Sequence, residues 1–359
     1  MPFALSVIVT ARDEPVRRIE RLLQAVAEQD VDGAVQVLIA VPPEERGRFA
    51  HLHPTGSVAE VLIVDNPAGG RSSGLNRAAR ASSAPIVCRL DARTLPPPDY
   101  LRRCALRLGS DPAVGMVGGT QCPRPSGSST LGVGIARALA NPWLLGAAAY
   151  RRPGASGPVD TVYLGAFRRN QLFALGGWEE RLDANEDFDL ATRYREAGWL
   201  VWLEEGLEVG YEPRGSLRSV YRQYNAFGQW KVRFWRMRGA RPNGRQLLAL
   251  GLAGATIPSF VLAAASSLWL GIAAVELLAM ALCALDHAGG RSQTRFGVRT
   301  AAVAASVAVV AGWLSGIAWG ALRSVALPHG GATHASRRSP SAGRARPAPP
   351  GSGPLGRAA

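Results

Sequence analysis

The feature that most restricts how this chain of 359 residues can fold is a long apolar segment in its last third. No charged side chain occurs between Arg245 and Glu276, and the chain stays apolar to Leu285. Because a helix needs about 20 apolar residues to cross a bilayer, this length suffices for two crossings. The uncharged run from Ala301 to Leu322 would allow a third. We therefore predict two or three membrane helices within residues 246–322, after a first domain over residues 1–230.

The formal net charge of +14 is concentrated in two groups of basic residues that flank the apolar runs. They are Lys231, Arg233, Arg236, Arg238, Arg241 and Arg245 on one side, and Arg323, Arg337, Arg338, Arg344, Arg346 and Arg357 on the other. Basic residues beside membrane helices are typical of cytoplasmic segments on anionic lipid. We expect a basic juxtamembrane segment at 231–245 and a disordered, basic tail rich in Pro, Gly, Ser and Ala at 323–359. No nucleic-acid partner is expected, since no recognition helix or aromatic RNA-binding motif accompanies the charge.

The placement of charge also predicts an orientation. With the first domain in the cytoplasm, two crossings return the loop that carries Arg291, Arg295 and Arg299 to the cytoplasm, as the positive-inside bias requires. A third crossing would put the basic tail outside, so either the last run is re-entrant or the tail escapes the rule. No basic leader precedes the strand-like start of the chain, and the four cysteines show no metal-type spacing. We expect a multi-pass protein of the cell membrane whose first domain is cytoplasmic.

The first domain alternates strand-like and helix-like segments. This order predicts an α/β fold, Rossmann-like, with a mainly parallel sheet and helices on both faces. The expected strands are Ser6–Thr10, Val35–Val41, Val61–Val64, Ile86–Leu90, Val114–Gly118 and Thr161–Phe167, and the expected helices are Val16–Gln29 and Ser73–Ala81.

Two acidic sites stand out within this pattern. Asp91 closes an apolar strand, at the carboxyl edge of the sheet where open α/β folds bind ligands. Asn185-Glu186-Asp187 follows a Gly176-Gly177-Trp178 turn. Together they suggest sugar transfer from a nucleotide donor. Plainer roles remain open, because an aspartate also ends strands in turns and acidic residues favour the first turn of a helix.

Five segments occur in a fixed order along the chain. They are Thr10-Ala11-Arg12-Asp13-Glu14, Asp65-Asn66-Pro67 with Arg71 and Leu75-Asn76, Arg89-Leu90-Asp91-Ala92-Arg93, Gly176-Gly177-Trp178 and Asn185-Glu186-Asp187. This order resembles that of family 2 glycosyltransferases, over about residues 4–322. The chain is most similar to membrane-associated members that act in succinoglycan-type exopolysaccharide assembly.

The resemblance implies a GT-A fold followed by membrane helices, and inverting transfer from a nucleoside diphosphate sugar. It implies a catalytic base within this acidic segment, for which Asp187 is the candidate, with Glu186 beside it and Glu186 or Asp189 as the open alternatives. Asp91 would hold a divalent ion, Mg²⁺ or Mn²⁺, at the donor diphosphate. The residues implied for donor binding are Ala11, Arg12, Glu14, Asp65, Arg71, Asn76, Asp91 and Arg93.

Two departures from the family pattern qualify these roles. Arg93 stands where the family has a second metal-side group, and a guanidinium does not coordinate a metal. It either contacts the diphosphate directly or points away and leaves the ion to Asp91. The Gln-x-x-Arg-Trp pattern of processive synthases is also missing, since Gln223 and Trp230 have a different spacing. A contact of Lys231 or Arg222 with the diphosphate stays open.

The sequence therefore predicts a glycosyltransferase that adds a sugar to a lipid-linked or glycan acceptor at the cytoplasmic membrane face. The pathway expected is exopolysaccharide or cell-envelope glycan synthesis. Two alternatives stay open: a processive polysaccharide synthase, and a catalytically inactive scaffold that binds a nucleotide sugar.

Overall fold

The computed structural model describes residues 3–141, 144, 148–152, 154–242, 244, 246–247, 250–251 and 296–326. The chain divides into two compact units, Met1–Ala321 and Leu322–Ala359, and the fold described below is that of the first. Most of the predicted membrane segment up to Leu285 lies outside the described residues, as does the tail from residue 327.

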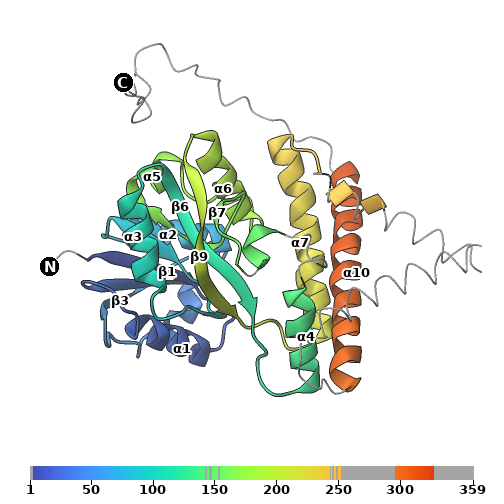
Figure 1. Ribbon diagram of the computed structural model, residues 1–359, viewed down its shortest axis with the longest axis horizontal. Coiled ribbons are helices and arrows are strands. Elements are labelled where there is room, and N and C mark those ends of the chain that lie inside the picture. The colour runs from blue at the N-terminus through green and yellow to red at the C-terminus, as the bar shows by residue number, and fades with distance from the viewer. Residues whose placement is uncertain are drawn as a thin grey trace, which may run out of the picture. The chain divides into compact units, whose positions relative to one another are not determined.

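The first unit is built around one nine-stranded sheet with the order β3-β2-β1-β4-β8-β6-β9-β5, in which β7 also pairs with β9 (Figure 1). The strands β1 to β4 form a parallel half, with Val7 opposite both Val37 and Cys88. Strand β8 runs antiparallel to β4 and β6, so the sheet is mixed. The bounds are β1 Leu5–Thr10, β2 Val35–Val41, β3 Val58–Asp65, β4 Ile86–Arg89, β5 Thr94–Leu95, β6 Val114–Pro123, β7 Gly157–Pro158, β8 Tyr163–Arg168 and β9 Leu200–Tyr211.

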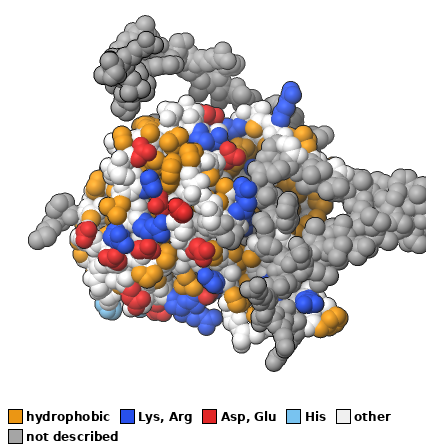
Figure 2. Space-filling model, in the orientation of Figure 1, with side chains coloured by type: hydrophobic (Ala, Val, Ile, Leu, Met, Phe, Trp, Pro, Cys, Tyr) orange, Lys and Arg blue, Asp and Glu red, His pale blue; other side chains and the backbone are white. Residues whose placement is uncertain are grey.

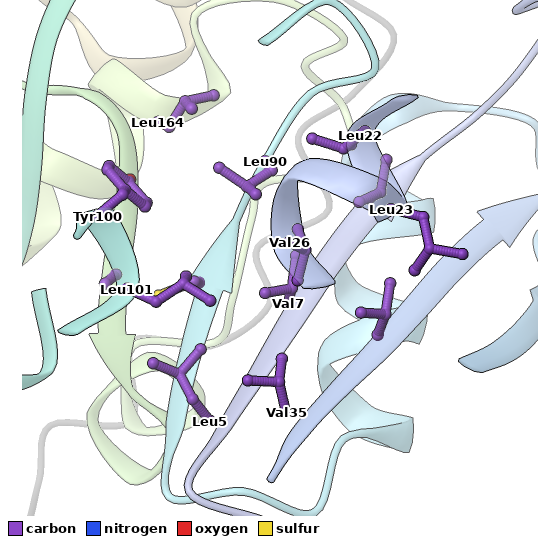
Figure 3. Close-up of a cluster of buried hydrophobic side chains, with 14 of the residues drawn as sticks. Leu5, Val7, Leu22, Leu23, Val26, Val35, Leu90, Tyr100, Leu101 and Leu164 are labelled. Carbon is purple, nitrogen blue, oxygen red and sulfur yellow. The ribbon is translucent and has the colours of Figure 1, made fainter. Parts of the chain in front are cut away.

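Helices cover both faces of the sheet, which confirms the predicted α/β class. Successive strand residues point to opposite faces, so Val7 joins one buried cluster and Ile8 the other. The first cluster packs against α1 (Val16–Ala27) and α3 (Tyr100–Ser110), and Figure 3 shows side chains of β1, α1 and α3 meeting there. The second packs against α2 (Arg71–Ala81), α5 (Arg169–Ala174) and α6 (Glu186–Glu196). Short 3-10 turns, η1 (Pro43–Phe49) and η2 (Ala149–Arg151), complete the unit.

A layer of three helices lies beside the sheet domain. Helices α4 (Thr130–Ala140), α7 (Leu217–Arg238) and α10 (Phe296–Ala326) share a buried cluster that includes Ile135, Tyr224 and Val309. In Figure 1, α7 and α10 run side by side. The predicted boundary between residues 230 and 231 falls inside α7, so the basic segment begins as a continuation of this helix.

Glycines bring α7 and α10 into backbone contact. Gly312, Gly316 and Gly320 recur every fourth residue and therefore share one face of α10. A Cβ at Gly312 would lie 2.6 Å from the carbonyl oxygen of Tyr221, and one at Gly316 would meet the carbonyl oxygen of Asn225. Ser315 Oγ, between them, is 2.9 Å from both Tyr221 Oη and Asn225 Nδ2. Small residues with interhelical hydrogen bonds are how helices pack closely in membranes.

Only one helix of the described residues, Phe296–Arg323, is long and apolar enough to cross a membrane, and this holds by length and composition alone. It contains the predicted run from Ala301 to Leu322. The prediction of several membrane helices is therefore not confirmed, because the remaining candidate segment lies outside the described residues.

The close crossing leads to a first prediction. Gly316→Val should lower the free energy of unfolding by roughly 1–3 kcal/mol, because the added side chain has no room against the α7 backbone. Ala318→Val places the same side chain at an exposed position of α10 and should leave stability nearly unchanged. Chemical unfolding of the two variants measures the difference, and equal stabilities would contradict the described packing.

Candidate active site

One cavity of about 1170 Å³ extends from the end of β4 to the helical layer. Its polar wall carries Asp91, Glu186 and Asp187, and its far wall carries Trp230 of α7 and Trp313 of α10. Strand β4 ends at Arg89, and Asp91 follows in a turn in which its backbone oxygen accepts hydrogen bonds from Thr94. Figure 2 shows basic and acidic side chains interspersed over the visible face of the sheet domain.

Arg89 lies at the centre of the polar wall and is 1% exposed. Its Nη2 lies 3.2 Å from Asp91 Oδ1 and 3.1 Å from Glu186 Oε1, and its Nη1 donates to Asp187. A buried guanidinium needs paired carboxylates, because its desolvation is otherwise uncompensated. Arg89 thus brings two sites together that are almost a hundred residues apart in the sequence.

Helix α6 presents both candidate catalytic carboxylates in its first turn. It begins at Glu186, after Asn185 in the left-handed conformation with φ 65°. Asp187 also accepts a hydrogen bond from Trp178 Nε1 at 3.2 Å. Trp178, 1% exposed, is therefore a core residue that fixes the orientation of the proposed base.

The carboxyl groups of this wall differ in their pKa values. Burial raises the pKa of Glu186 to about 7, the charge of Asp187 adds to this, and Arg89 opposes it. Burial also raises the pKa of Asp187, despite the opposing charge of Arg89. For Asp91, burial acts in the same direction but is outweighed by Arg89 and Arg71, so its pKa is lowered. The site therefore holds Asp91, whose pKa is lowered, next to Glu186 and Asp187, whose pKa values are raised.

Two further arginines lie on the predicted donor side of the cavity. Arg71 Nη1 lies 3.5 Å from Asp91 Oδ2 and 4.0 Å from Glu186 Oε1. Arg93 pairs with Glu14, with Nε 3.3 Å from Oε1, and Glu14 also pairs with Arg18 at 2.9 Å. Among the described residues, the carboxylate that pairs with Arg93 is therefore that of Glu14, and Arg93 forms no ion pair with Asp91.

Four of the predicted donor-binding residues do not line this cavity. Ala11 is buried and donates its backbone N–H to Ala40, while Arg12 is exposed and donates to the backbone of Gly69. Asp65 forms an exposed ion pair with Arg46 at 2.8 Å. Asn76 is 3% exposed.

Asn76 supports the Gly177-Trp178 turn. Its Nδ2 donates to the backbone oxygen of Trp178 at 2.8 Å and to Glu180 at 2.9 Å, and its Oδ1 accepts from the backbone N–H of Trp178 at 2.8 Å. These bonds use both polar atoms of the side chain, so Asn76 stabilises the turn. It does not line the cavity, and its donor contact stays a prediction.

Arg89 is a cavity residue that the sequence did not single out for a role in the site, whereas Lys231, one of two residues expected as possible contacts of the donor diphosphate, also lines the cavity. A signal for Arg89 exists in the sequence, because a cation inside the apolar run Ile86-Val87-Cys88-Arg89-Leu90 needs a buried partner. Among the described residues, no group of three or more His, Cys, Asp and Glu side chains is placed to hold a metal ion.

Comparison with known proteins adds the chemistry. The family model described as glycosyltransferase like family 2 matches residues 2–227. The chain belongs to this family. It is therefore a glycosyltransferase, and the cavity at the carboxyl edge of its sheet is the candidate active site.

Two similar proteins extend this result. The succinoglycan biosynthesis protein ExoA of Rhizobium meliloti (strain 1021) is 31% identical over 199 residues, which is 54% of this glycosyltransferase and 58% of that protein. The match thus spans little more than half of the relative's length. The mannosyltransferase PcManGT from Pyrobaculum calidifontis, solved in complex with GDP-Man and Mn²⁺, has 20% identity and a TM-score of 0.51 over 88% of this chain and 89% of that one. This second likeness supports the GT-A-like fold.

The raised pKa of Glu186 gives a prediction about stability. Its ordinary value is 4.5, and its value in the fold is about 7. Between these two values the unfolded chain has released a proton that the folded glycosyltransferase keeps, so the free energy of unfolding falls as the pH rises. Glu186→Gln removes this contribution and should flatten the decline, as measured by thermal unfolding across that pH range.

Glu205→Gln is the matched control, because this side chain is exposed on β9. It should keep the pH dependence of the native protein. A Glu186→Gln variant whose unfolding temperature runs parallel to the native curve would contradict the buried, proton-retaining state of Glu186.

Proposed function

We propose that this glycosyltransferase is an inverting enzyme that transfers a sugar from a nucleoside diphosphate donor to a lipid-linked or glycan acceptor. The observation that carries the proposal is that Asp91 and Asp187 contact the same buried guanidinium in one cavity. An inverting reaction needs a group that stabilises the leaving diphosphate and a base on the acceptor side. Asp91 and Asp187, which both contact Arg89, are the proposed residues for these two roles.

Asp187 is the proposed base. The acceptor hydroxyl must lose its proton as it attacks the anomeric carbon, and a carboxylate within hydrogen-bond reach accepts it. Trp178 and Arg89 hold this carboxylate from two directions. Burial raises the pKa of Asp187, which makes its carboxylate a better proton acceptor than an exposed aspartate.

The donor diphosphate is proposed to bind at the end of β4, near Arg71 and Arg93. Both guanidinium groups line the cavity, and they offset the negative charge that gathers on the leaving group. Glu14, which lines the cavity and pairs with Arg93, is proposed to lie near the nucleoside.

The divalent ion suggested by the Mn²⁺ in the mannosyltransferase structure would have one ligand from this chain. Asp91 is that ligand, and the other ligands would come from the donor diphosphate. The described residues otherwise fit poorly, because both Asp91 oxygens face guanidinium groups and Arg93 contributes no oxygen. When bound, the ion would neutralise charge on the diphosphate.

The acceptor is proposed to enter from the helical layer. Val310, Trp313 and Leu314 of α10 and Trp230 of α7 line the same cavity as Asp187. An apolar wall next to a catalytic carboxylate suits a substrate with a sugar attached to a lipid. It also favours the cytoplasmic membrane surface as the place of reaction, and the similarity to a succinoglycan biosynthesis protein favours exopolysaccharide or cell-envelope glycan synthesis.

The test of the proposed base is Asp187→Asn. Because a general base contributes about 10²–10⁴-fold to rate, the variant should release nucleoside diphosphate at least about 100-fold more slowly, with little change in the KM for the donor. Purified membranes and a panel of nucleotide sugars identify the donor first. Asp30→Asn, which changes an exposed aspartate that pairs with Arg102 at 2.8 Å and does not line the cavity, is the control and should keep activity.

Transfer that survives Asp187→Asn unchanged would remove the base assignment and favour the scaffold alternative. Product length from the same membranes decides between single addition and a processive synthase. We expect a single added sugar.

The ion leads to a separate prediction. Mn²⁺ alone should not bind saturably to the donor-free protein, since the described residues include no group of three or more His, Cys, Asp and Glu side chains placed to hold a metal ion. Adding nucleoside diphosphate should produce saturable binding, and Asp91→Asn should weaken it by about tenfold or more. Electron paramagnetic resonance of Mn²⁺ measures both, and tight binding without nucleotide would contradict the described geometry.

A further inference from the structure

Lys231 is the only lysine among the 41 lysine and arginine residues of the chain. It lies on α7, is 9% exposed, and lines the same cavity as Asp187. Arginine serves every other cationic position, including the exposed ones. The single side-chain ammonium group of this protein is therefore a buried cavity group.

The surroundings of Lys231 are aromatic. Its Nζ lies 4.3 Å from the ring centroid of Phe188 and 4.8 Å from that of Phe234, and the two rings pack edge to face. Ring faces attract a cation but do not neutralise it. No carboxylate of the described residues forms an ion pair with Lys231, and burial lowers its pKa to about 8. The ammonium group thus lacks a counterion.

The carboxylates of α6 and the arginines on the donor side of the cavity already form ion pairs with one another or with nearby residues. On α6, Glu186 and Asp187 pair with Arg89, and Asp189 pairs with Arg193 at 2.9 Å and with Arg238 at 2.6 Å. At the donor end of the cavity, Arg71, Arg89 and Arg93 are all paired with carboxylates. Lys231 differs from these cations because no described carboxylate pairs with it. Other cavity-lining cations also have no ion pair within the described part of the chain, but Lys231 is more buried than all of them: Arg151, Arg152, Arg214 and Arg222.

The apolar wall indicates what that ligand carries. Trp230 precedes Lys231 on α7, and Val310 and Trp313 of α10 line the same cavity. An anion beside these side chains gains most if it is attached to an apolar chain. A compact ammonium group between two rings suits a phosphate oxygen as a point charge, whereas the planar fork of arginine needs more room.

We propose that Lys231 is the binding site for the phosphate group of an amphiphilic acceptor, a phosphate ester attached to a long apolar chain. This inference rests on the proposed function and assigns one part of its acceptor site. The donor diphosphate is proposed to bind at the end of β4 near Arg71 and Arg93, so the two phosphate-containing substrates would have separate cationic groups.

The single lysine makes a direct test possible. Full-length protein in a nonionic detergent, labelled with ¹³Cε-lysine, gives one lysine side-chain resonance whose shift reports the protonation of Lys231. Farnesyl phosphate should raise the measured pKa by about one unit or more, because an opposite charge at short distance favours the ammonium form. Farnesol and nucleoside diphosphate should leave it unchanged, and inorganic phosphate should act only at much higher concentration.

Lys231→Met removes the charge and keeps similar volume, and it should weaken binding of farnesyl phosphate by about tenfold or more. Arg233→Met is the matched control, because Arg233 is exposed on α7 beside Trp230 and does not line the cavity. It should bind farnesyl phosphate like the native protein. The resonance of the native protein decides the question even if Lys231→Met fails to fold.

A Lys231 resonance that ignores farnesyl phosphate, or that responds equally to nucleoside diphosphate, overturns the inference. The proposed function fails separately, through absence of nucleoside diphosphate release with every donor. Sugar transfer together with a Lys231 resonance that does not respond to farnesyl phosphate would therefore support the proposed function and contradict the Lys231 site. Binding of farnesyl phosphate at Lys231 without any sugar transfer would support the site and contradict the proposed function.

Discussion

The arrangement of the whole site depends on one buried cation. Arg89 lies in the sheet at 1% exposure and contacts three carboxylates, on the turn after β4 and on the first turn of α6. Loss of the guanidinium would leave like charges close together in a region with little water, which is costly for the folded state. The same interaction that stabilises the fold therefore fixes the distance between the proposed donor and acceptor sides.

The site is also connected to the helical layer through α6. Asp189, two residues after the proposed base, pairs with Arg238 of α7, and Phe188 packs against Phe234. Helix α7 in turn contacts α10 through glycines and through Ser315. A contiguous set of contacts thus links Asp187, the proposed base, to the apolar helix, so the proposed acceptor wall on α10 is connected to the elements that carry this carboxylate.

Several features could be read from the sequence because they have local causes. Apolar strands such as Val35–Val41 are fully buried in the structure, and the predicted bounds of β2 agree with the observed ones. Asp91 was placed at the carboxyl edge because the strand before it is apolar. The hydrogen bonds of Asn76 go to a turn a hundred residues later, and no local sequence pattern indicates them. The basic segment from residue 231 was read as a lipid anchor, whereas Lys231 is buried and Arg238 is paired.

By itself, the sequence determined the family, the α/β class and the two acidic sites. Strand burial, turn residues and motif order depend on residues that are close together in the sequence. Only the tertiary structure decided that Arg89 joins these sites, that Arg93 pairs with Glu14, and that Lys231 lines the cavity without an ion pair to any described carboxylate. The physical reason is that the partner of a buried charge is chosen by the packing of distant elements. Residue type shows that a partner is required, and the fold supplies it.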